Sequence, residues 1–225
     1  MVNFTILAGG YTSFVASYLF NSKAGSLTLL SQSPTGSNPS WITSHPTNSN
    51  ILYAVNEVSS GVLQSFTINT DGSLAGPVEQ ISSGGNSPAY ASALSTSQVA
   101  IMNYGSGNGE MIPTVSDPLH FSQNASLITF PPPDGGVSHP HMALEHGAEV
   151  FISDLVSCIA YYAVRNYSDF FIGTLGCRQN LEINRRRLSG HMENSRIYHT
   201  TPRKRSSSHG HLRCSLSLHH SFYTF

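Results

Sequence analysis

The chain has 225 residues, of which 39% are apolar and 10% charged, and its formal net charge is −1. This length suits one domain, with or without a tail. No apolar run reaches the roughly 18 residues that cross a membrane, and the first residues lack the basic and apolar regions of a secretory signal, so we expect a cytoplasmic, non-membrane protein.

The charges divide the chain near Leu155. Up to this residue one lysine, Lys23, stands against nine carboxylates, a balance of −8. From Val156 onward ten Lys or Arg residues stand against three carboxylates, a balance of +7, and all three cysteines lie here. A change this abrupt indicates a boundary. We therefore expect a folded part over 1–155 and a different, disordered tail over 156–225.

A loop rich in Gly and Pro leads into an apolar run three times along the folded part. The pairs of loop and run are 36–41 before Ile51–Val55, 85–90 before Val99–Met102, and 136–141 before Val150–Ile152. The prolines of these loops, Pro39, Pro88 and Pro140, are 49 and 52 residues apart. A fixed period of this length is typical of repeat architectures.

A second repeat keeps step with the first, because Phe20–Leu27 recurs 48 residues later as Ile68–Leu74. Within it, Val62–Asn69 is predicted to be a strand, and Asp71-Gly72 supplies the positive φ angles of a tight hairpin. No segment has the spacing of an amphipathic helix. All-β units of forty to fifty residues favour four-stranded propeller blades over the alternative, a β-sandwich.

Five segments, in this order and spacing, resemble one known family. They are Gly-Gly-Tyr-Thr at 9–12, Leu-Tyr-Ala-Val-Asn-Glu at 52–57, Gly-Gly-Asn-Ser-Pro-Ala at 84–89, Ser-His-Pro-His at 138–141 and Val-Phe-Ile-Ser-Asp-Leu at 150–155. The family is that of the 6-phosphogluconolactonase-like (lactonase) seven-bladed β-propellers. The resemblance implies a partial propeller of about three to four blades and an enzyme that hydrolyses a small sugar lactone. It leaves open a carboxymuconate-cyclising enzyme of the same fold.

The resemblance stops at Leu155, and the genetic code offers a cause. Val156-Ser157 can be encoded as GTG AGT, a splice donor, and Thr174–Gly176 can contain an acceptor. Removing the bases between them shifts the frame, and the codons after it then spell Gly-Ala-Asp-Lys-Ile, which in the family follows such a segment. We therefore predict that 156–175 is a translated intron and that 176–225 is frame-shifted. The chain would then be a truncated, inactive fragment.

Frame-shifted codons also account for the basic clusters Arg185–Arg187 and Arg203–Arg205, so we expect no nucleic-acid binding. Cys177 and the histidines of the tail lack the Cys-x-x-Cys or His-x₃-His spacing of a zinc site. We expect neither a metal nor a cofactor.

Opening a lactone requires a base that activates water and donors for the oxyanion. The resemblance points to His139 and His141, with Glu57 after the strand Ile51–Val55 as a further candidate. Hydrogen-bonded loop positions are the alternative for the two histidines, and a solvated carboxylate is the alternative for Glu57. His45 and Trp41 are expected to pack the blade.

Residues 1–155 contain no arginine to match an anionic substrate. A non-enzymatic interaction propeller is a third possibility, although its Gly-His and Trp-Asp signatures are missing.

Overall fold

The computed structural model describes residues 2–130, 136–155, 159–166 and 169–176. Within these ranges the chain forms antiparallel sheets of consecutive strands and no helix. The prediction of an all-β partial propeller is confirmed, because each sheet corresponds to one blade.

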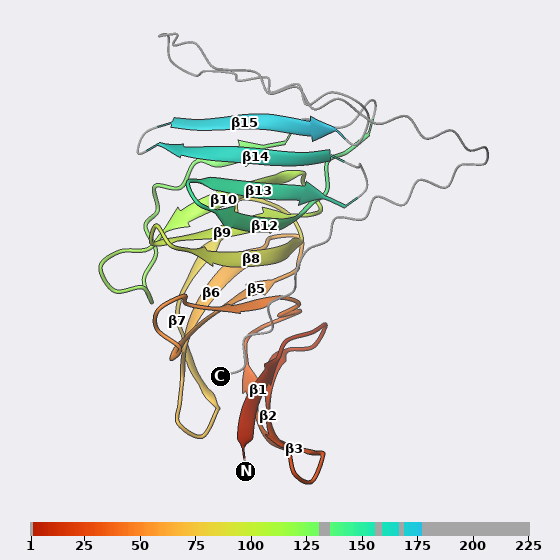
Figure 1. The fold of residues 1–225 in the computed structure, drawn as a ribbon, viewed down its shortest axis with the longest axis vertical. Helices are drawn as coiled ribbons and strands as arrows, with labels where there is room; N and C mark the ends of the chain where they lie inside the picture. The colour runs from red at the N-terminus through yellow and green to blue at the C-terminus, as the bar shows by residue number, and fades with distance from the viewer. Residues whose placement is uncertain (1, 131–135, 156–158, 167–168, 177–225) are drawn as a thin grey trace, which may run out of the picture.

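The first sheet has three strands, β1 (Asn3–Ala8), β2 (Phe14–Asn21) and β3 (Ser26–Pro34). The second has four, β4 (Ile42–Ser44), β5 (Ile51–Asn56), β6 (Val62–Ile68) and β7 (Leu74–Ser82). The third is β8 (Pro88–Leu94), β9 (Gln98–Asn103), β10 (Asn108–Pro113) and β11 (Leu127–Thr129). The fourth is β12 (Pro140–His146), β13 (Glu149–Asp154), β14 (Ile159–Asn166) and β15 (Asp169–Gly176). Figure 1 shows the sheets following one another from β1–β3 to β12–β15. We call them blades 1 to 4.

The apolar runs of the sequence are strands that are buried on both faces. In β5, Tyr53 and Val55 pack toward blade 3, whereas Leu52 and Ala54 belong to the core between blades 1 and 2. The strand β9 is divided in the same way between the cores on its two sides. Alternate side chains of a strand point to opposite faces, so a strand between two other blades must be apolar at every position.

The hairpin between β6 and β7 is where the sequence predicted it, but its backbone differs in one respect. Gly72 has a φ of 82°, whereas Asp71 is not among the described residues with positive φ. The carboxylate of Asp71 instead accepts a hydrogen bond from the amide N–H of Ser73, at 2.9 Å. The expectation of positive φ at both positions is therefore wrong, because the Asp71 side chain closes this turn with an ordinary backbone.

The fourth sheet continues past Leu155. Strands β14 and β15 extend it through Gly176, pairing in order with β13. The origin of residues 156–175 in an intron concerns the gene and stays a prediction. The basic clusters and Cys177 lie outside the described residues.

Candidate functional site

One hydrogen bond recurs in three blades and sets the geometry of the site. The amide N–H groups of Glu57, Tyr104 and Leu155 donate to the carbonyl groups of Asn38, Ser87 and His139, at 2.9, 3.0 and 3.0 Å. Each donor directly follows the second strand of its blade, and each acceptor directly precedes the repeated proline. The period seen in the sequence is therefore a repeated backbone contact.

A hollow of about 380 Å³, which we call the cleft, opens beside these contacts. Three of its lining residues, Ser40, Ala89 and His141, directly follow the repeated prolines. Three more are the donors named above, and Tyr11 and Trp41 complete the lining. Equivalent positions of consecutive blades thus converge on one cleft, which four blades share.

Two of the three predicted site residues, Glu57 and His141, line this cleft. His139 lies beside it and is held by its own contacts. Its backbone N–H donates to Oδ2 of Asp154 at 2.7 Å, and its Nδ1 lies 2.9 Å from the carbonyl O of Tyr104. Because a carbonyl only accepts, Nδ1 carries the hydrogen, and Nε2 is the acceptor when the ring is neutral.

The ring of Tyr104 positions both histidines. Its centroid lies 4.4 Å from that of His139, with the planes 30° apart, and 6.2 Å from that of His141, nearly edge-on at 85°. Contacts of this kind restrict ring rotation. Tyr104 therefore links the histidine beside the cleft to the one within it.

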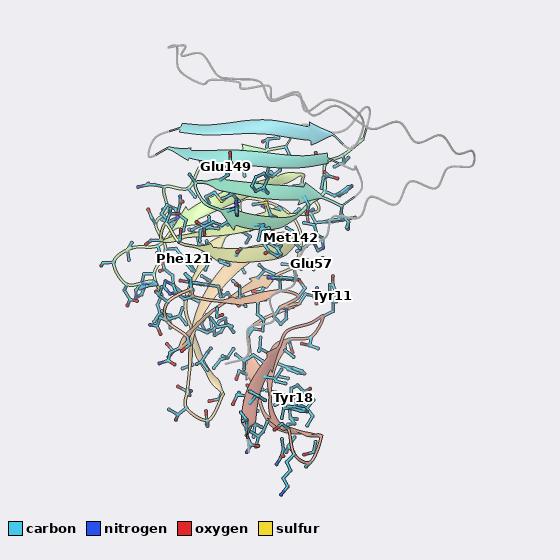
Figure 2. The ribbon with its side chains drawn as sticks, viewed as in Figure 1. Tyr11, Tyr18, Glu57, Phe121, Met142 and Glu149 are labelled. Atoms are coloured by element: carbon cyan, nitrogen blue, oxygen red, sulfur yellow. The ribbon has the colours of Figure 1, made fainter. Side chains whose placement is uncertain are left out.

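The carboxylate of Glu57 accepts a hydrogen bond from the hydroxyl of Tyr11, at 2.9 Å (Figure 2). This bond raises the pKa of Tyr11 above its ordinary value of 10.0, with smaller contributions from burial and from the charge of Glu57. The raised pKa means that the phenol stays protonated at neutral pH and remains the donor.

Glycine at position 9 allows the loop of Tyr11 to approach blade 2. A Cβ at Gly9 would lie 2.3 Å from the carbonyl O of Pro39, whereas one at Gly10 meets nothing within 4 Å. Gly10 donates its N–H to that same carbonyl, at 2.8 Å. The Gly-Gly motif thus sets the position from which Tyr11 reaches Glu57.

Ser40, Tyr11 and Tyr104 were missed as site residues by sequence reasoning. The hydroxyl of Ser40 is buried and has no hydrogen-bond partner among the described residues. Trp41 packs the blade as predicted, with its ring centroid 4.6 Å from that of Tyr90, and it also lines the cleft. The signal that could have found Ser40 and Tyr104 was their equivalence to His141 and Glu57 in the repeat.

His45 does not line the cleft. Its Nδ1 lies within hydrogen-bond distance of the backbone N–H groups of Thr47 and Asn48, at 3.3 and 3.1 Å, and so closes a turn. In the part of the chain that the structure describes, no group of three His, Cys, Asp or Glu residues is arranged to hold a metal ion. No helix in that part is long and apolar enough to cross a membrane.

Together these features define a β-propeller whose repeated loops line one cleft. The family model described as Lactonase, 7-bladed beta-propeller matches residues 5–166. The chain belongs to this family.

Solved structures share the fold at low identity. A protein assigned as a 6-phosphogluconolactonase from Bacteroides uniformis gives a TM-score of 0.68 at 20% identity, over 79% of this chain and 56% of its own. A second such protein, from Bacteroides fragilis, gives a TM-score of 0.65 at 22% identity, over 74% of this chain and 49% of its own. The periplasmic gluconolactonase of Pseudomonas aeruginosa gives a TM-score of 0.65 at 22% identity, over 72% of this chain and 50% of its own. The chain thus spans about half the length of the structures it matches. No curated protein matches it in sequence.

Proposed function

We propose that the protein hydrolyses sugar lactones by a ring opening of the 6-phosphogluconolactonase type, and that the cleft is part of its active site. The observation that carries this proposal is the convergence of Glu57 and His141 on one cleft. Family membership and the likeness to assigned 6-phosphogluconolactonases support it.

In the proposed reaction His141 takes a proton from water as the water oxygen attacks the carbonyl carbon of the lactone. Negative charge then collects on the carbonyl oxygen, which a hydrogen-bond donor of the complete site must stabilise. Collapse of this intermediate breaks the ring C–O bond, and His141 returns the proton to the leaving alkoxide. The product is the open hydroxy acid, and Glu57 holds the substrate through its ring hydroxyls.

A comparison of two histidines on one strand tests the role of His141. In the spliced protein we expect His141→Gln to lower kcat for a sugar lactone by about 100-fold or more, the range for loss of a general base. His146 ends the same strand, β12, and is exposed, so His146→Gln is the matched control and leaves kcat unchanged. Equal effects of both substitutions would refute the assignment.

We also propose that this chain is a truncated form with an incomplete site. The matched part of the chain covers only 56% and 49% of two structural relatives, which supports this proposal, as does the splice signal that can be written at Val156-Ser157. Sequencing the mature transcript across codons 156–175 tests the proposal. We expect the spliced form to lack these codons and its product to hydrolyse lactones faster than this chain. A mature message that retains them and encodes an active lactonase would refute it.

A further inference from the structure

We propose that the cleft selects uncharged, unphosphorylated sugar lactones and that Glu57 is the residue that determines this specificity. The inference rests on the proposed lactone hydrolysis and names the substrate class of that site. It follows from the charge of Glu57, from the way its position is fixed, and from the groups that surround it.

The carboxylate of Glu57 is held in place from two sides. Its side chain accepts the hydrogen bond of Tyr11, at 2.9 Å. Its backbone is tied to Asn38 twice, since its N–H donates to the Asn38 carbonyl at 2.9 Å and its carbonyl accepts from Asn38 Nδ2 at 3.1 Å. These contacts favour one position of the carboxylate at the edge of the cleft.

Among the residues that the structure describes, those that line the cleft include no Lys or Arg that could offset this charge. A phosphate bound in the cleft would therefore meet a carboxylate of the same sign. At a separation of roughly 8 Å and an intermediate dielectric constant, repulsion between two unit charges weakens binding by about tenfold or more.

The remaining groups suit an uncharged polyol ring. Trp41 is braced by Tyr90, and Tyr104 is braced by His139, so the cleft has rigid aromatic walls. Rigid aromatic surfaces with a few polar groups are typical of small-molecule sites. Glu57 can accept hydrogen bonds from ring hydroxyls. A neutral sugar lactone can use all of these groups.

Tryptophan fluorescence monitors the cleft directly, because Trp41 lines it and is the only tryptophan of the chain. We would titrate the full chain with a stable ring analogue, 1,5-anhydroglucitol, and with its 6-phosphate, and follow tryptophan fluorescence. We expect the neutral analogue to bind about tenfold more tightly or better. Stronger binding of the phosphate, or no fluorescence response to either analogue, would overturn the proposal.

Two carboxylates then separate a local effect from a change in total charge. We call the ratio of the dissociation constants of the two analogues the gap. Glu57→Gln should narrow this gap to about threefold or less by strengthening binding of the phosphate. Glu149 begins β13, far from Glu57 in Figure 2, and Glu149→Gln removes the same charge without changing the gap. An unchanged gap in Glu57→Gln would refute the assignment of specificity to this residue.

Hydrolysis measured in parallel keeps the inference apart from the proposed function. The spliced protein is assayed with glucono-lactone and with its 6-phosphate by acid release. Preference for the neutral analogue without hydrolysis of either lactone refutes the lactonase proposal and retains the binding specificity of the cleft. Hydrolysis that is faster with the phosphorylated lactone supports the lactonase proposal and overturns the inference.

Discussion

The ring of His139 donates from Nδ1 to the carbonyl O of Tyr104, over 2.9 Å, and this contact decides which ring nitrogen is left to accept a proton. We expect the neutral ring of His139 to be the tautomer with hydrogen on Nδ1. Nitrogen-15 NMR would then show a pyrrole-like Nδ1 and a pyridine-like Nε2. Because the acceptor is a backbone carbonyl, Tyr104→Phe should preserve this tautomer. The opposite assignment of the two nitrogens would contradict the contact.

The phenol of Tyr11 should respond to the charge of Glu57. A carboxylate that accepts its hydrogen bond opposes formation of the phenolate, which is why the pKa of Tyr11 is raised. We expect Glu57→Gln to lower the pKa of Tyr11 toward 10.0, as followed by NMR titration of carbon-13-labelled tyrosine. The signal is assigned with Tyr11→Phe, and Glu149→Gln is the control that should leave it in place. An unchanged pKa in Glu57→Gln would mean that the pair does not form in solution.

The two glycines before Tyr11 should differ sharply in tolerance. Gly9→Ala places a Cβ 2.3 Å from a backbone oxygen, and we expect it to reduce the free energy of unfolding by about 1–3 kcal/mol. Gly10→Ala meets open space and should change it by less than about 0.5 kcal/mol. Urea denaturation measures both. Equal stability of the two variants would show that the loop does not approach Pro39 as closely as in the structure.

Alkaline pH should lower the free energy of unfolding through ionisation of Tyr53. Burial, with a smaller effect of the Asp117 charge, raises the pKa of Tyr53 from 10.0 to about 12. The folded state holds this proton more tightly than the unfolded state, so the stabilisation is complete below pH 10 and is lost as the pH rises from 10 to 12. The loss amounts to about 2–3 kcal/mol.

Urea denaturation from pH 8 to 12 measures this loss, and Tyr53→Phe isolates the contribution of the hydroxyl. The variant loses the hydrogen bond to the carbonyl of Pro118, 2.8 Å long, so we expect it to be about 1 kcal/mol less stable at pH 8. Its stability should fall less steeply above pH 10. An equal slope in both proteins would exclude Tyr53 as the source of the effect.

Much of the blade architecture could be predicted from the sequence because blades repeat and because their second strands are apolar throughout. The runs beginning at Ile51 and Val99 are strands β5 and β9, and the loops before them carry the repeated proline. The backbone of the turn at Asp71 could not be predicted, since a side-chain hydrogen bond there replaces a positive φ angle.

The site was predictable in part, for a different reason. The family resemblance pointed to His141, Glu57 was a further candidate after the strand Ile51–Val55, and both line the cleft. Tyr11 and Ser40 carry no catalytic signature of their own, and they reach the cleft only because the blades bring segments far apart in sequence to one end. His139 was predicted together with His141 and packs against the same Tyr104 ring, but its Nδ1 is bound to a backbone carbonyl and it lies beside the cleft.

The backbone hydrogen bond that recurs in three blades supports the fold without constraining the side chain of the residue that donates it. Glu57, Tyr104 and Leu155 make the same contact through their amide groups, whatever their side chains are. Selection can therefore exchange an acid, a phenol or an aliphatic group at these positions one blade at a time, while the scaffold stays intact. A cleft built in this way can acquire a new ligand by single substitutions. An engineer could vary the same three positions independently of one another.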